Sequence, residues 1–548
     1  MDAIATTPTP VNEPVGSFAP GTPERHRLRR ALTELAATPT EITHVIGGRA
    51  VRGDGALFEV VQPHRHAAVL GTLHEAGTAE ATAAVAAAVD AAPAWQAMAF
   101  EDRAAIFLRA ADLLAGPWRE TIAAATMLGQ SKSAYQAEID APCELVDFWR
   151  FNVSFARGIL AGQPLSTRGV WNRMQYRSLE GFVYAVTPFN FTAIAGNLPT
   201  APALMGNTVI WKPARSQAVA AYLTMRLLEA AGLPPGVINL VNGAGAAVSD
   251  VVLADPHLAG VHFTGSTATF QHLWREVAGN LDRYRTYPRL VGETGGKDFV
   301  LAHPSADPAV LTTALLRGAF DYQGQKCSAA SRAFVPRSVW AAMSEDLIEK
   351  TSALRYGDIT DFANFGGALI DRAAFDRNVT ALERAKATPG LTVVAGGHSD
   401  DAEGWFVEPT VVVGDDPTDE VFHTEYFGPI LAVHVYDDST PTGFTDAMDL
   451  VDRGSAYGLT GSIIAQDRAA IAAATDRLTF AAGNFYINDK PSGAVVGQQP
   501  FGGGRASGTN DKAGSAQNLL RWTSARTIKE TFTPPTEHRY PHQEPEAH

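Results

Sequence analysis

Cysteine is nearly absent from this sequence, since only Cys143 and Cys327 occur among its 548 residues. Disulfide scaffolds and zinc sites both require several cysteines at short spacings, so neither is expected, and no bound metal is predicted. A long chain with so few thiols is typical of a reducing compartment. We therefore predict an intracellular protein and place it in the cytoplasm.

Basic residues are also scarce, because 44 Lys and Arg stand against 58 Asp and Glu and leave a net charge of −14. Nucleic acids and anionic membranes are bound by clustered Lys and Arg, so neither is expected as the main partner. Residues 1–24 contain no Lys or Arg and no apolar core. We expect a flexible arm there rather than a secretory signal or a transit peptide.

Charge is missing altogether from residues 181–211, a run long enough to cross a bilayer. Pro188, Pro199 and Pro202 would break a helix in this run, and its asparagines would be costly in lipid. We therefore predict that the run lies buried inside the protein and spans no membrane.

Apolar runs and helix-length segments alternate from residue 181 onward, for example "GFVYAVTP", "NTVIWKP" and "GVHFTGS". This alternation is typical of a parallel sheet covered by helices, and a second series extends from "SRAFVPRS" to "AGNFYIND". The sequence thus predicts an α/β protein with two tandem open parallel-sheet domains. The polar insert 162–180 and the tail after about residue 513 fit neither series, and such segments commonly pair with each other or with another subunit.

Two of the apolar runs end in residues suited to a phosphate-bearing ligand. "GVHFTGST" (260–267) predicts a strand, a turn at Gly265 and Ser266, and then a helix whose free N–H groups could bind phosphate. Taken alone, an ordinary capped helix is the more probable interpretation by about three to one. Lys212 ends another strand, where ligands bind in open α/β sheets, although a surface lysine is the preferred interpretation if the residue is taken alone.

Cys327 and Glu293 are the candidate catalytic residues. Cys327 lies among small residues in "GQKCSAASR", and we expect this loop to enter a helix whose amides, with Lys326, favour the thiolate. Glu293 in "VGETGGKD" is bordered by glycines and could serve as a general base, or it could be a solvated loop residue. No histidine motif pairs with the cysteine, and Cys143 is interpreted as buried and inert. A Cys–Glu pair in such a fold indicates oxidation through a thioester.

Seven motifs now identify a resemblance that covers about residues 45–530. In order they are "TPFNFTAIAGN", "WKP", "FTGS", "ETGGK", "GQKCSAASR", "EYFGPIL" and "GQQPFGGGRASGTND". Together they closely resemble the aldehyde dehydrogenase superfamily, with a Rossmann-type cofactor domain and a catalytic domain. Within it, "PFNFTAI", "NFYINDK" and "VGQQPFGG" resemble the branch that oxidises L-glutamate γ-semialdehyde to L-glutamate with NAD, the second step of proline catabolism.

The resemblance implies roles for individual residues. Cys327 would be the nucleophile, Glu293 the base and Asn190 a donor to the oxyanion. The cofactor contacts implied are Thr187, Lys212, Gly265, Ser266, Glu425 and Phe427. Arg215 departs from the acidic or small polar residue that many NAD enzymes have there, which keeps NADP open as the cofactor.

The resemblance also implies a substrate site, at Glu144, Phe191, Ser328, Gly493, Ala494 and Phe501. The loop "PSGAVVG" (491–497) resembles the one that binds the amino-acid head of the substrate. Ala494 stands where that loop normally has a serine, so one side-chain hydrogen bond would be missing.

The resemblance further implies the organisation of the chain. It predicts an N-terminal arm and helix (1–44), an NAD-binding domain (45–161 and 181–293), a catalytic domain (294–490), a substrate-anchor loop returning to the NAD-binding domain (491–513) and a small β oligomerisation flap (162–180 and 514–548). A homodimer or higher homo-oligomer is expected, functionally paired with a separate proline dehydrogenase. The alternatives are an aldehyde dehydrogenase of broader specificity and a catalytically silent scaffold of the same fold.

Overall fold

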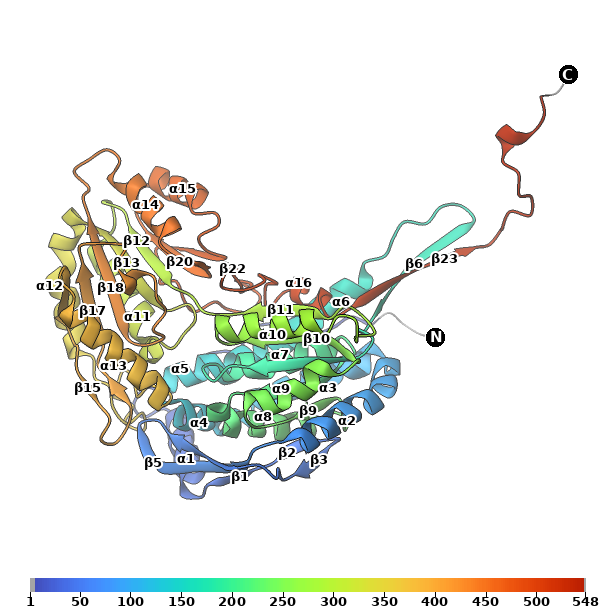
Figure 1. Cartoon of the computed structure of the whole chain (residues 1–548), viewed down its shortest axis with the longest axis horizontal. Helices are drawn as coiled ribbons and strands as arrows, with labels where there is room; N and C mark the ends of the chain where they lie inside the picture. Colours follow the sequence, from blue (N-terminus) through green and yellow to red (C-terminus); the bar gives the residue numbers. More distant parts are fainter. Residues whose placement is uncertain (1–4, 547–548) are drawn as a thin grey trace.

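The computed structural model describes residues 5–546 and contains two lobes, each built around a seven-stranded sheet (Figure 1). The first sheet has the strand order β11-β10-β7-β8-β9-β2-β3. Its strands are β2 (His44–Ile46), β3 (Arg49–Val51), β7 (Phe182–Thr187), β8 (Thr208–Pro213), β9 (Ile238–Leu240), β10 (Leu258–Thr264) and β11 (Arg289–Glu293). All of them are parallel except the β2–β3 hairpin at one edge.

Alternate residues of β7 enter two separate cores. Val183 and Ala185 pack with α3 (Phe100–Ala115), α6 (Glu144–Ala161), α7 (Thr192–Leu204) and α8 (Ala218–Ala230). Phe182 and Tyr184 pack on the opposite face with α2 (Thr78–Ala97), α9 (Gly245–Ala254) and α10 (Thr267–Gly279). Burial on both faces explains why these strands are almost uninterrupted apolar runs.

The uncharged run 181–211 forms β7, α7 and β8 and is buried, as predicted. The expectation that its prolines would break a helix was wrong, because Pro199 and Pro202 both lie inside α7. Pro202 has no N–H for the carbonyl of Leu198. The His262 side chain is hydrogen-bonded to that carbonyl at 2.9 Å instead, so a tertiary contact replaces the missing helical bond.

The second sheet has the order β14-β17-β18-β13-β12-β20-β21, and only β14 is antiparallel to its neighbour. Its strands are β12 (Asp298–Ala302), β13 (Ala330–Pro336), β14 (Leu391–Ala395), β17 (Thr410–Gly414), β18 (Ile430–Tyr436), β20 (Thr460–Ile464) and β21 (Asn484–Ile487). Helices α11 (Pro308–Phe320), α12 (Arg337–Ala353), α13 (Arg372–Ala387), α14 (Gly443–Arg453) and α15 (Arg468–Arg477) cover it. The predicted fold class, two tandem α/β sheet domains, is confirmed.

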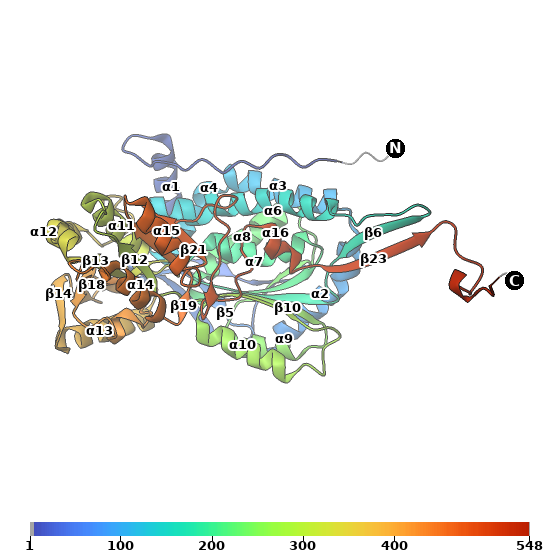
Figure 2. The ribbon, with the colours of Figure 1, turned by 90° about the horizontal axis from the view of Figure 1, so that it is seen from above.

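Two segments lie outside this two-lobed body. β6 (Val170–Arg177) and β23 (Ser524–Thr531) form an antiparallel ribbon that projects from the first lobe (Figure 1). The N-terminal arm leads to α1 (Pro23–Ala37) and runs along the side of α4 (Arg119–Gln130) and α6 (Figure 2). Instead of the flexible arm that we expected, residues 12–16 are held by hydrogen bonds and ion pairs.

No single helix within residues 5–546 has both the length and the apolar character needed to cross a bilayer. The helices α2 and α3 meet those criteria only as a pair, bent by 113° at their junction.

Candidate active site

Four neighbouring strands of the first sheet end at the same edge and bring the predicted cofactor residues together. Thr187 ends β7, Lys212 lies at the end of β8, Gly265 follows β10 and Glu293 ends β11. Because these strands are parallel and adjacent, the four positions form one row in the order Glu293, Gly265, Thr187 and Lys212. This edge is where open α/β sheets bind their ligands.

The second sheet contributes the amino ends of its strands. Cys327 lies three residues before β13, and Glu425 and Phe427 lie shortly before the adjacent strand β18. The loop of Cys327 therefore enters a strand, and the helix that we predicted after it was wrong. The site thus combines the carboxyl edge of one sheet with the amino edge of the other.

A cavity of about 410 Å³ connects the predicted catalytic and substrate residues. Cys327 and Glu293 both line it. So do all six residues that we expected at the substrate, which are Glu144, Phe191, Ser328, Gly493, Ala494 and Phe501. Cys143 lines the same cavity but is buried, and burial raises the pKa of its thiol well above the ordinary range.

Cys327 is partly exposed, but its surroundings do not favour the thiolate. Burial, followed by the carboxylates of Asp298 and Glu293, raises its pKa well above the ordinary value. Lys326, which we expected to lower that pKa, instead directs its ammonium toward Asp140, 3.3 Å away. The predicted stabilisation of a thiolate by Lys326 and a helix was therefore wrong.

Glu293 lies between the sheet and the returning C-terminal loop, near the charged groups of Asp511 and Lys512. Burial raises the pKa of its carboxyl well above the ordinary value. Its Oε2 atom is buried and has no hydrogen-bond partner in the described part of the chain. Gly502 lies close to this carboxyl, and a Cβ there would lie 2.8 Å from Oε1 of Glu293 and displace its side chain. A carboxyl with a raised pKa and a free oxygen can act as a proton acceptor.

Asn190 is buried and lies against the Cys327 loop, although it is not part of the cavity wall. Its Nδ2 donates a hydrogen bond to the carbonyl of Gln325 at 2.9 Å, two residues before the cysteine. An amide group has two N–H donors, so a second one remains for an oxygen bound near Cys327.

The cofactor residues have the chemistry of a dinucleotide site. Lys212 is buried, its pKa is lowered to about 8 by burial and then by Arg215, and its Nζ contacts only the Pro213 carbonyl, at 3.4 Å, among the described residues. Ser266 is the N-cap of α10 and accepts a hydrogen bond from Thr269 N at 3.2 Å. Thr187 is fixed by the indole of Trp211, which donates to its hydroxyl at 3.0 Å.

Glu425 and Phe427 are the two predicted cofactor residues that come from the second sheet. Oε1 of Glu425 accepts a hydrogen bond from the N–H of Gly296 at 2.8 Å, and burial raises the pKa of this carboxyl to about 7. Phe427 has a φ of 56° and packs edge-on against Phe189 with 5.9 Å between ring centroids. Each of the six predicted cofactor residues therefore lies near the junction of the two sheets.

Arg215 is already paired with a carboxylate. Its Nη1 lies 2.9 Å from Oε1 of Glu75, and its guanidinium covers the ring of Phe58 at 4.8 Å. A guanidinium that is already paired with a carboxylate is a weaker donor to the 2′-phosphate of NADP.

Two parts of the site were missed from the sequence. One is a buried cluster in which Lys132 and Lys326 share Asp140, at 2.7 and 3.3 Å, beside the ring of Phe191. The other is the N-terminal arm, since Asn12 lines the cavity together with Cys327. The arm carries no recognisable motif, and its partners lie more than a hundred positions away in the chain.

Comparisons with known proteins agree with this geometry. The aldehyde dehydrogenase family matches residues 51–528. The mitochondrial delta-1-pyrroline-5-carboxylate dehydrogenase of Bos taurus is 48% identical over 97% of this chain and 94% of its own. The crystal structure of the Mycobacterium tuberculosis delta-pyrroline-5-carboxylate dehydrogenase bound with NAD is 67% identical over 99% of both chains, with a TM-score of 0.96. Proline utilization A from Bdellovibrio bacteriovorus is 28% identical, with a TM-score of 0.91, and this chain covers 55% of it. This chain therefore belongs to the aldehyde dehydrogenase family.

Proposed function

We propose that this protein oxidises L-glutamate γ-semialdehyde, the open form of 1-pyrroline-5-carboxylate, to L-glutamate with NAD, in the second step of proline catabolism. The observation that carries the proposal is the shared cavity, in which Cys327 and Glu293 face the loop residues Gly493 and Ala494. The bovine and mycobacterial proteins are named for this activity, and both match this chain over nearly its full length.

Cys327 and Glu293 divide the chemistry between them. The S–H bond of Cys327 breaks and its proton passes to solvent, the sulfur bonds to the aldehyde carbon, and the carbonyl oxygen takes the electron pair of the C=O bond, stabilised by Asn190 and the backbone N–H of Cys327. Each such donor is worth about 3 kcal/mol in comparable acyl chemistry. NAD, when bound, serves as the oxidant that accepts a hydride from this carbon, which leaves a thioester on Cys327. Glu293 then removes a proton from water, the water oxygen bonds to the carbon, and the C–S bond breaks to release the acid.

The cofactor is held by residues of both sheets. The free N–H groups at the start of α10, after Gly265, suit the pyrophosphate, and the ammonium of Lys212 suits a ribose hydroxyl. Glu425 and Phe427 would bind the nicotinamide end. NAD is favoured over NADP because Arg215 is already paired with Glu75, so its guanidinium is less available to a 2′-phosphate.

The amino-acid head of the substrate is matched by polar groups that line the cavity. No group within residues 5–546 accepts a hydrogen bond from the N–H of Gly493 or Ala494, so both can bind the α-carboxylate. Glu144 lines the cavity, and its pKa is raised to about 8 by burial and by Asp140. A substrate ammonium would favour its ionised form. Ser328 supplies a hydroxyl, which could substitute for the one absent at Ala494.

The assembly and its partners are further parts of the proposal. The ribbon of β6 and β23 would join at least two copies of the chain, because two strands alone are marginally stable. The preceding oxidation of proline would be catalysed by a separate proline dehydrogenase. The cytoplasmic location rests on composition alone, and the bovine relative is named as a mitochondrial protein.

The test is NADH formation by the wild type and by Cys327→Ala with three aldehydes. We expect the highest kcat/KM for glutamate semialdehyde, with propanal and succinate semialdehyde well below it, and with NAD preferred to NADP. Cys327→Ala should lose more than about a thousandfold in kcat with an unchanged Tm. Equal rates for the three aldehydes would instead support a dehydrogenase of broad specificity, and retained activity in Cys327→Ala would refute the mechanism.

A further inference from the structure

We propose that Asn12 is a positioning residue for recognition of the amino-acid head. Through Asn12, the N-terminal arm holds the anchor loop (residues 491–499) in the conformation that presents Gly493 and Ala494 to the cavity. This inference rests on the proposed function and adds to it a segment that lies almost five hundred positions from the loop in the chain.

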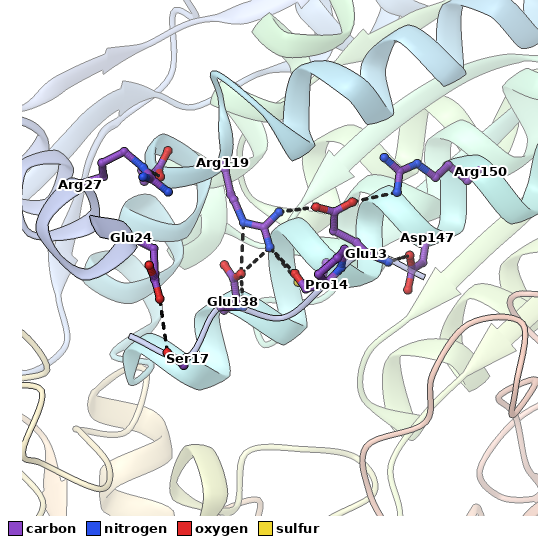
Figure 3. Close-up of polar contacts among 12 residues, drawn as sticks. Glu13, Pro14, Ser17, Glu24, Arg27, Arg119, Glu138, Asp147 and Arg150 are labelled. Carbon is purple, nitrogen blue, oxygen red and sulfur yellow. Dashed lines mark hydrogen bonds and ion pairs between the residues drawn. The ribbon is translucent and has the colours of Figure 1, made fainter. Parts of the chain in front are cut away.

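The arm is attached firmly to the first lobe. The carboxylate of Glu13 lies between Arg119 and Arg150, at 2.6 and 2.8 Å, and its side chain is only 11% exposed (Figure 3). Arg119 also donates to the carbonyl of Pro14 at 2.7 Å and to Glu138 at 3.1 Å. Charge-assisted hydrogen bonds to two guanidinium groups are among the stronger polar contacts in proteins. They fix the arm where Asn12 reaches the cavity.

Asn12 uses its whole carboxamide to bridge two elements. Its Nδ2 donates to Oδ2 of Asp147 on α6 and to the carbonyl of Val496 in the anchor loop, both at 2.8 Å. Its Oδ1 accepts a hydrogen bond from Nε2 of Gln498 at 3.0 Å. The second oxygen of Asp147 accepts the N–H of Glu13 at 2.7 Å, so the bridge is anchored at both ends. Only an amide side chain offers both donors and an acceptor here.

The anchor loop needs such an external contact. Gly493 and Gly497 have φ values of +91° and +83°, and glycine leaves the backbone free at both positions. Between them, the N–H of Val495 donates to Oε1 of Gln499, and the carbonyl of Val495 accepts the N–H groups of residues 498 and 499, all at 3.0 Å. Residues 495–499 are therefore a compact turn. The bonds of Asn12 to Val496 and Gln498 fix its orientation.

Movement of the anchor loop should affect only substrates that carry an α-amino acid head. Gly493 and Ala494 contact the amino-acid head, whereas the reacting aldehyde lies at Cys327. A loop that moves should weaken the binding of an aldehyde with an α-amino acid head. It should leave an aldehyde without that head, and NAD, unaffected. No hydrogen bond joins the arm to Lys212 or to Ser266 within the described residues.

The experiment compares Asn12→Ala with the wild type in the full-length protein. We expect KM for glutamate semialdehyde to rise about tenfold, equivalent to about 1.4 kcal/mol, with kcat close to the wild-type value. KM for NAD and kcat/KM for propanal should not change. Hydrogen exchange supplies a readout besides activity, because the amides of residues 498 and 499 should exchange faster in the variant.

Two further variants complete the design. Asn12→Asp keeps the shape and the acceptor but loses both N–H donors, so it should raise KM in the same selective way if Asn12→Ala is unstable. Ser17→Ala is the matched control, because the Ser17 hydroxyl lies on the same arm, contacts Glu24 at 3.3 Å and does not touch the loop. It should behave as the wild type.

The outcomes separate this inference from the proposed function. If both Asn12 variants keep the wild-type KM for the semialdehyde, or if KM rises equally for propanal, the positioning role is refuted. If the wild type itself does not prefer the semialdehyde to propanal, the proposed substrate is refuted instead, independently of what the variants do.

Discussion

At the scale of single residues, the most informative group is the sulfur of Cys327. Burial is the main cause of its raised pKa, and Asp298, Glu293 and Glu425 lie close enough to raise this pKa further. The free protein should therefore hold this cysteine as a thiol at neutral pH. A thiol is oxidised and alkylated far more slowly than a thiolate. Burial and these neighbouring carboxylates thus protect the nucleophile before substrate arrives.

Glu425→Gln should make Cys327 more reactive in a pH-dependent way. The pKa of Glu425 is raised to about 7, so its carboxylate is ionised above that pH and neutral below it. Above about pH 7 the substitution removes a negative charge, lowers the pKa of the thiol and increases the thiolate fraction. Alkylation by iodoacetamide should become about three- to tenfold faster near pH 8.5, and equally fast in both proteins near pH 6.

Mass spectrometry of the alkylated peptide is the measurement, and Cys143 is an internal control because it is buried in the same molecule. If Cys327 is alkylated at the same rate in Glu425→Gln and in the wild type throughout the pH range, Glu425 does not influence the sulfur. Faster alkylation of the variant at pH 6 as well would indicate a structural change rather than the loss of a charge.

At the scale of elements, the geometry of the anchor loop depends on one glycine that faces α6. Gly497 has a φ of +83°, and a Cβ at this position would lie 2.2 Å from a ring carbon of Phe151. A side chain there is strained by its backbone conformation and by the clash, and either effect costs about 1–3 kcal/mol. The loop can relieve the clash only by moving away from α6.

Gly497→Ala should therefore lower Tm by several degrees and raise KM for glutamate semialdehyde, while KM for NAD stays constant. The matched control is Gly158→Ala in α6, where a Cβ would have no neighbour within 4 Å. That change should stabilise the protein by about 0.5–1 kcal/mol, because alanine is the better helix former. A lower Tm for Gly497→Ala together with a higher Tm for Gly158→Ala would confirm that the backbone conformation at position 497 requires glycine. A stable Gly497→Ala with wild-type KM would contradict it.

The elements also show what the sequence could and could not reveal. Thr187, Lys212 and Gly265 were predictable as neighbours, because apolar runs mark strands and parallel strands end at one edge. The conformation of the Cys327 loop was not predictable, because Tyr322 and Gln323, which lie just before the cysteine, take positive φ values. The Gln323 side chain holds this turn by donating to the carbonyls of Ser131 and Ala368, contacts that no local pattern encodes. Asn12 was missed for the same reason.

At the scale of the whole molecule, the projecting ribbon is the feature that a single chain does not explain. β6 and β23 pair along their full length, yet most of their residues are exposed or only half-buried. Leu165 and Trp171 lie on or beside the ribbon with 92% and 49% of their surface exposed. Apolar side chains on a protruding ribbon favour contact with another protein surface, which is a second copy of the chain in the assembly that we propose.

A chain that ends at Thr523 should accordingly lose its assembly. It lacks β23, so β6 has an unpaired edge and the ribbon cannot form. We expect the full-length protein to be at least a dimer in analytical ultracentrifugation, and the shortened chain to be a monomer at the same concentration. A chain that ends at Thr531 keeps both strands and is the matched control. This chain lacks only the segment beyond the ribbon. If β6 and β23 form the contact between subunits, it should contain as many subunits per assembly as the full-length protein. If the two shortened chains dissociate alike, the segment after Thr531 joins the subunits, and if neither dissociates, the interface lies elsewhere.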